Sequence, residues 1–113
     1  WPLAGPSRHI ATAALADRAW QRATRARLAE DCARLVALLT RHGLRPAGGT
    51  ALFQWIPTGQ APGLHVALAR HGVLTRLFEN PPGLRFGLPG DASGWQRLDA
   101  ALAACTRPAD AHP

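Results

Sequence analysis

A chain of 113 residues, 47% of them apolar, is long enough to bury one hydrophobic core and is typical of a single domain. Its longest apolar runs are far too short to cross a bilayer, and no charged segment followed by an apolar one opens the sequence. We therefore expect no membrane span, no secretory signal and a cytoplasmic location. The net charge is +6, and all 13 residues counted as lysine or arginine are arginine.

A basic chain can be a nucleic-acid-binding protein. Here the arginines are spread along the sequence, without a basic run, a zinc finger or an RNP-like motif. We therefore expect no nucleic-acid partner. A basic module that binds nucleic acid or protein stays open as the alternative from another class of function.

The two cysteines, Cys32 and Cys105, are isolated, with no CxxC spacing, and the histidines are scattered. We expect two buried, reduced thiols and no metal site. The sequence starts at Trp1 and contains no methionine, so we expect it to be a piece of a longer protein.

Two helices are predicted at the start of the chain. Ser7 is a plausible N-cap of a short helix over residues 9–16, and Asp17 can cap a second one. Gly43 ends the second helix, in the position where a left-handed conformation suits glycine. The second helix is amphipathic, with a stripe at helical spacing made of Trp20, Thr24, Leu28, Cys32, Leu35 and Leu39.

The middle of the chain alternates between strands and a helix. Gly48-Gly49 indicates a turn, and residues 51–56 form a strand that Pro57 ends. A third helix starts near Pro62 and closes at Gly72. Two short strands follow, over residues 73–78 and 84–88, separated by ENPPG.

The last helix begins after Asp91, its predicted cap, and its buried stripe is Trp95, Leu98, Leu102 and Cys105. The order α-α-β-α-β-β-α predicts an α+β fold, a small and mostly antiparallel sheet covered by helices on one face. Residues 1–105 are expected to form this domain and residues 106–113 a flexible tail.

Catalytic groups are scarce. Glu30 and Asp31 are adjacent on a helix and point apart, so they cannot work as an acid/base pair. Ser7 and Ser93 both lie at helix starts, where capping explains them. We therefore expect no catalytic, cofactor-binding or metal-ligating residue in this chain.

Arg76 and Arg85 stand out because each interrupts an apolar strand. A buried guanidinium without a partner is very costly, so each arginine lies at a rim, pairs with an acid, or is reserved for an anionic ligand. Only Glu79 is close in sequence. The planar fork of arginine suits carboxylate and phosphate, and the residues alone leave an anion site and solvent-facing arginines both open.

Four segments together resemble the C-terminal small domain of fold-type I pyridoxal-phosphate enzymes, the class I/II aminotransferase group. They are RxRLAEDxxRLxxLLxxHGL, GGTALFQW, LHxALARHGVLTRLF and LRFGLPGDxxxWxRLDAAL. The closest likeness is to the threonine-phosphate decarboxylases of cobalamin biosynthesis, with histidinol-phosphate aminotransferases next. It covers nearly the whole chain, and LRFGLPGD is its most specific piece.

The resemblance implies that Arg85 binds the substrate α-carboxylate and that Arg76 contacts a substrate phosphate. It implies decarboxylation of L-threonine O-3-phosphate by the full-length enzyme, or alternatively an aminotransferase reaction of the histidinol-phosphate type. Residues 50–53 depart from many aminotransferases because they lack an asparagine.

The same resemblance implies pyridoxal phosphate as cofactor, held by a lysine in a large domain, and a homodimer of the full-length protein. This chain has no lysine. We therefore expect the large domain to be missing, the cofactor not to bind this fragment, and the fragment alone to be inactive.

Overall fold

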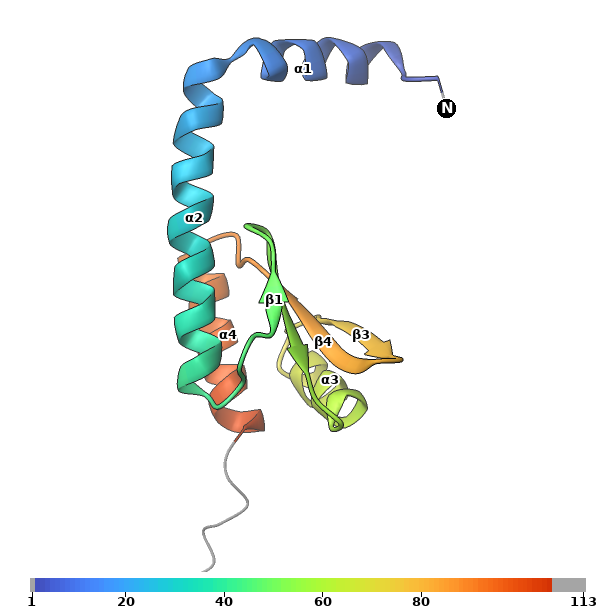
Figure 1. The fold of residues 1–113 in the computed structure, drawn as a ribbon, viewed down its shortest axis with the longest axis vertical. Coiled ribbons are helices and arrows are strands. Elements are labelled where there is room, and N and C mark those ends of the chain that lie inside the picture. Colours follow the sequence, from blue (N-terminus) through green and yellow to red (C-terminus); the bar gives the residue numbers. More distant parts are fainter. Residues whose placement is uncertain (1, 107–113) are drawn as a thin grey trace, which may run out of the picture.

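The computed structural model describes residues 2–106, which form four helices and a four-stranded sheet (Figure 1). The helices are α1 (Gly5–Ala16), α2 (Arg18–Arg41), α3 (Ala61–Arg70) and α4 (Ala92–Cys105). The strands are β1 (Gly48–Gly49), β2 (Phe53–Pro57), β3 (Arg76–Glu79) and β4 (Pro82–Gly87). The predicted α+β class is confirmed, and the predicted order lacked one strand, β1. The predicted tail lies outside the described residues from 107 onward, while Thr106 is the C-cap of α4.

Side chains cap two of the helices as predicted. The carboxylate of Asp17 accepts a hydrogen bond from the backbone N–H of Trp20 at 2.9 Å, and that of Asp91 accepts one from Gly94 at 2.7 Å. Gly43 follows α2 with φ of +80°, also as predicted. Ser7 is not an N-cap. The first helix begins at Gly5, two residues before Ser7, because the fixed φ of Pro6 suits its first turn.

The sheet is antiparallel in the order β1-β2-β4-β3. Gly48-Gly49, predicted as a turn, is the edge strand β1, in which Gly48 pairs with Trp55. A Cβ at Gly49 would collide with the carbonyl oxygen of Phe53. Glycine is therefore needed here because the two strands approach each other closely. In the sequence alone, a glycine pair with this role looks the same as one that forms a turn.

Strand β3 begins at Arg76, three residues later than predicted. The chain before it is still tied to α3, because the N–H of Val73 donates to the carbonyl of Leu68 at 3.0 Å. His65 Nδ1 lies 2.9 Å from the Thr75 hydroxyl, which makes a second hydrogen bond between α3 and this segment. Only from Arg76 onward are the backbone groups free to pair with β4.

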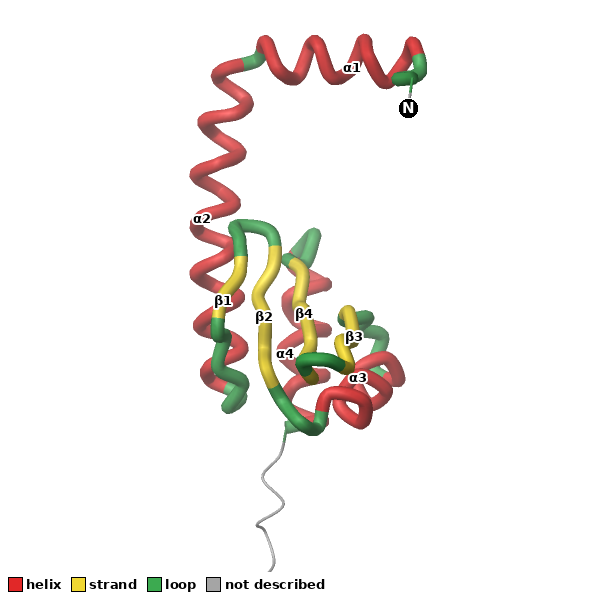
Figure 2. Tube along the Cα trace, turned by 45° about the vertical axis from the view of Figure 1, so that its right-hand side comes forward, coloured by secondary structure: helices red, strands yellow, loops and turns green. Residues whose placement is uncertain are grey.

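The core lies between one face of the sheet and three helices, as predicted. Figure 2 shows the sheet in front of α4, with α2 and α3 to its sides. The buried residues come from α2 (Leu35, Leu38, Leu39), the sheet (Ile56, Leu84, Phe86), α3 (Ala61, Leu68) and α4 (Trp95, Leu98, Ala101, Leu102). The predicted stripe of the last helix is confirmed for three of its members, and Cys105 packs half-buried at the edge of the core.

The first half of α2 and all of α1 project from this body as an arm (Figure 1). None of the residues of α1 is buried, and the side chains of Ile10, Leu15 and Trp20 are more than half exposed. The predicted stripe of α2 is therefore fully buried only at Leu35 and Leu39, because the C-terminal turns of α2 meet the core, whereas Thr24 and Leu28 are half-buried and Trp20 is exposed. No helix in residues 2–106 is long and apolar enough to cross a membrane.

Candidate anion-binding site

One face of the sheet is covered by none of the four helices that the structure describes, and we call it the open face. Side chains alternate between the two faces of a strand, so the register assigns each residue to a face. Ile56, Leu84 and Phe86 point into the core. The open face therefore carries Phe53, Trp55, Arg76, Phe78, Gly83, Arg85 and Gly87.

Arg76 and Arg85 are direct cross-strand partners on this face. The ladder pairs Arg76 with Arg85, and Arg85 in turn with Trp55 on β2, so the three residues form one row across the sheet. A bulge or bend near ENPPG could also bring two arginines to one side of a hairpin. None is present there: Glu79 pairs with Pro82 across a turn of Asn80 and Pro81, and the ladder is regular.

Arg85 is half-buried, and its side chain lies over an aromatic ring. The guanidinium carbon is 4.5 Å from the centroid of the Phe53 ring, close enough for a cation–π interaction. Phe53 stands opposite Gly87, which has no side chain to compete for this space. Gly87 therefore leaves the fork of Arg85 accessible on the open face.

Arg76 is exposed and lies over a different ring. Its guanidinium carbon is 5.4 Å from the centroid of Phe78 on the same strand. Phe78 meets Trp55 edge to face, with centroids 5.3 Å apart. The indole of Trp55 covers Gly83, where a Cβ would collide with it. Trp55 thus packs on Gly83, and Phe78 packs on Trp55 and contacts the guanidinium of Arg76.

The two arginines line one shallow pocket of about 360 Å³, together with Leu52, Phe53, Leu74, Thr75 and Gly87. Neither forms an ion pair within residues 2–106, where the only acid in such a pair is Asp99. Glu79, the acid close in sequence, alternates to the other face of β3. Two arginines without an acidic partner in residues 2–106 therefore line this pocket, and their guanidinium groups can bind carboxylate or phosphate.

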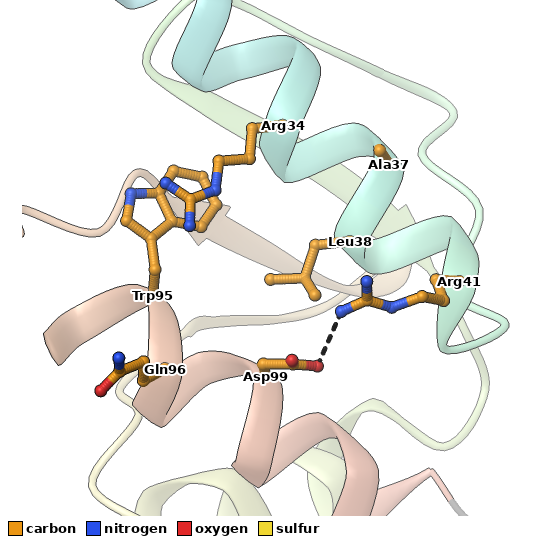
Figure 3. Close-up of a pocket in the computed structure, with 7 residues that line it drawn as sticks. All are labelled: Arg34, Ala37, Leu38, Arg41, Trp95, Gln96 and Asp99. Atoms are coloured by element: carbon orange, nitrogen blue, oxygen red, sulfur yellow. Dashed lines mark hydrogen bonds and ion pairs between the residues drawn. The ribbon is translucent and has the colours of Figure 1, made fainter. Parts of the chain in front are cut away.

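A second pocket, which the sequence did not reveal, lies between α2 and α4 (Figure 3). It measures about 420 Å³. The Arg34 guanidinium carbon lies 4.2 Å from the Trp95 ring centroid, and Arg41 donates to the Asp99 carboxylate at 3.0 Å. Asp99 is also 2.7 Å from His42 Nε2. These hydrogen bonds, that from His42 foremost, lower the pKa of the Asp99 carboxyl. Because its polar groups already pair with one another, we interpret this cluster as a clasp between the helices.

The cysteines are less buried than expected, since both are half-exposed at the edges of the fold, and they are free thiols. Burial raises the pKa of the Cys105 thiol. Cys32 Sγ accepts a hydrogen bond from the Gln54 amide at 3.2 Å, which links α2 to β2. Within residues 2–106, no three residues of the histidine, cysteine and acidic types lie close enough together to hold a metal ion.

No protein-family model matches the chain. Two curated relatives do. A threonine-phosphate decarboxylase of Pseudomonas aeruginosa is 52% identical over 109 residues, which cover 96% of this chain and 33% of the relative. A threonine-phosphate decarboxylase of Sinorhizobium sp. is 38% identical over 104 residues, which cover 91% of this chain and 31% of the relative.

The chain thus spans about one third of the length of the curated relatives that it matches. The match extends over nearly all of the chain, including the open face with its two arginines. These findings confirm the resemblance predicted from the sequence, because the chain is similar to one part of the threonine-phosphate decarboxylases and fits a C-terminal piece of such a pyridoxal-phosphate enzyme.

Proposed function

We propose that this chain is the substrate-binding domain of a pyridoxal-phosphate-dependent decarboxylase that acts on L-threonine O-3-phosphate in cobalamin biosynthesis. In this proposal Arg85 holds the substrate carboxylate and Arg76 its phosphate. The observation that carries it is the pairing of the two arginines on the open face, where no acid of residues 2–106 neutralises either. The names of the two relatives supply the substrate class.

The chain's own residues do not fit the covalent binding of the cofactor. Pyridoxal phosphate is held by a lysine and, when bound, supplies an electron sink for the bond that breaks. The chain has no lysine, so residues outside it must hold the cofactor. We propose that the 113-residue chain alone neither binds the cofactor covalently nor turns over substrate.

The contribution of this chain is binding and orientation. The guanidinium of Arg85 can grip both oxygens of a carboxylate, which fixes the direction in which the substrate's Cα–carboxylate bond points. The guanidinium of Arg76, exposed at the edge strand, can bind the phosphate. Holding the substrate at both ends restricts its rotation, and such positioning lowers the barrier of the step that follows.

The arm formed by α1 and the first half of α2 suits the proposed large domain. Its apolar side chains Ile10, Leu15 and Trp20 are 55–73% exposed, and Leu3, just before α1, is 73% exposed. Burial of such side chains against another domain is favourable by the hydrophobic effect. We propose that the remaining two thirds of the enzyme cover this arm, in a full-length protein that forms a homodimer in the cytoplasm.

An aminotransferase of the histidinol-phosphate type would use the same two arginines, so it remains the second candidate. Release of carbon dioxide distinguishes the decarboxylase from the aminotransferase. The full-length protein that carries this chain, supplied with pyridoxal phosphate and L-threonine O-3-phosphate labelled in the carboxyl group, should release the label as carbon dioxide in the absence of a keto acid. Retention of the label, with formation of a keto acid only when an acceptor keto acid is added, would identify an aminotransferase.

A further inference from the structure

The two arginine side chains start side by side and then diverge. They share one row of the ladder, yet Arg85 stacks on Phe53 and Arg76 on Phe78. Phe53 stands in the row of Gly87 and Phe78 in the row of Gly83. These rows lie four residues apart along β4, which is roughly 13 Å at the rise of an extended strand. The two guanidinium groups are therefore drawn toward opposite ends of the open face.

Repulsion between the two guanidinium groups would not by itself hold each of them in one position. Like charges directly opposite each other on paired strands repel, but repulsion alone leaves long side chains free to choose among rotamers. An aromatic face within about 6 Å gives each guanidinium a preferred position. Phe78 is itself held by Trp55, and Trp55 by the absence of a side chain at Gly83.

We infer that Phe53 and Phe78 are positioning residues that hold the guanidinium groups of Arg85 and Arg76 apart, so that the site selects a ligand with an anionic group at each end. This inference rests on the proposed function, because it assigns the two anionic groups to one substrate. A ligand with a single anionic group would engage only one of the two stacked arginines. Neither phenylalanine has to contact the substrate for this role.

The test replaces each ring by leucine in the full-length enzyme, which keeps an apolar side chain of similar size. For Phe78→Leu we expect kcat/KM on the phosphorylated amino acid to fall about two- to fivefold, the equivalent of one exposed cation–π contact. The same amino acid without its phosphate should be unaffected. For Phe53→Leu we expect kcat/KM to fall by a similar factor on both substrates, because both carry the carboxylate. The ring-preserving variants Phe78→Tyr and Phe53→Tyr should restore the wild-type values.

A double-mutant cycle separates positioning from general packing. In an Arg76→Ala background, Phe78→Leu should have no further effect on the phosphorylated substrate, since the guanidinium that it positions is gone. Equal losses on both substrates for Phe78→Leu, full additivity with Arg76→Ala, or tyrosine variants as poor as leucine variants would each overturn the inference. If Phe53→Leu or Phe78→Leu fails to fold, the variant with methionine at that position takes its place, because methionine adapts to irregular packing.

The failure of the proposed function would look different. If Arg76→Ala and Arg85→Ala themselves leave both substrates unaffected, the arginine pair does not bind the substrate. If the arginine variants lose activity as proposed and the phenylalanine variants do not, only the positioning role is wrong.

Discussion

The indole of Trp55 lies directly against the backbone of Gly83, so that a Cβ at residue 83 would collide both with the ring and with the carbonyl oxygen of Ile56. Four residues further along β4, Gly87 faces the same side of the sheet, and a Cβ there would meet nothing within 4 Å. The two glycines that bracket Arg85 thus have different roles, the first in packing and the second in keeping space open.

This difference predicts opposite outcomes for two matched substitutions. Gly83→Ala should lower the free energy of unfolding by about 1–3 kcal/mol, because an overpacked site must shift backbone or ring. Gly87→Ala should change it by less than about 0.5 kcal/mol. Urea unfolding of both variants measures this, and equal stabilities for the two would mean that Trp55 does not pack on Gly83.

The core should depend strongly on Leu98, which is 4% exposed between the helices and the sheet. Leu98→Ala should cost about 2–5 kcal/mol in free energy of unfolding, because it leaves a cavity. Leu74→Ala is the matched control, since Leu74 is 84% exposed and its loss should fall within about 0.5 kcal/mol. A Leu98→Ala variant as stable as Leu74→Ala would show that the last helix does not pack as described.

Acid should weaken the clasp between α2 and α4. The pKa of Asp99 is lowered by its hydrogen bond from His42, by that from Arg41 and by the charges of both. A carboxyl with a lowered folded-state pKa adds stability above its unfolded pKa of about 3.9, and this is lost as the pH falls through the folded pKa. Asp99→Asn should therefore lose less stability than the wild type between about pH 5 and pH 2.

Unfolding by urea across that pH range, with Glu30→Gln as a control on an exposed helix face, checks the prediction. If the free energy of unfolding depended on pH in the same way in wild type and Asp99→Asn, the prediction would be contradicted. Asp91 should behave in the same direction, since its hydrogen bond from the Gly94 N–H, and then that from Ser93, lower its pKa.

The isolated chain should not fix the cofactor on a side chain. Because it has no lysine, treatment with pyridoxal phosphate and then borohydride should leave every side chain unmodified when peptides are mapped by mass spectrometry. No carbon dioxide should form from L-threonine O-3-phosphate. A reduced adduct on a side chain, or turnover, would show that the chain carries chemistry that its residues do not suggest.

Local signals in the sequence were sufficient for several features of the fold. Asp17, Asp91 and Gly43 mark helix ends through interactions within one or two turns, and the structure confirms them. Gly48-Gly49 was mistaken for a turn because the requirement for glycine comes from a strand that lies next to it only in the folded chain. The exposure of Trp20 could not be predicted from periodicity, which indicates a face but not what covers it.

The candidate site was predicted only in part for the same reason. Arg76 and Arg85 stood out as charges in apolar strands, but whether they face the same side depends on the strand register, which the residues alone leave uncertain. The ladder shows them as direct partners. The roles of Phe53, Trp55 and Phe78 depend on cross-strand neighbours, and no local pattern pointed to them.

The central claim is that the two arginines divide the anions of one substrate between them, and substitution of Arg76 in the full-length enzyme tests it most directly. Arg85→Lys should weaken every amino-acid substrate by about 1.5–3 kcal/mol in kcat/KM, because an ammonium cannot reproduce the two-pronged pair. Arg70→Ala, an exposed arginine of α3, is the control and should change neither substrate. Arg76→Ala should lower kcat/KM for the phosphorylated amino acid far more than for its unphosphorylated analogue, whereas equal losses on the two substrates would contradict the assignment of the phosphate to Arg76.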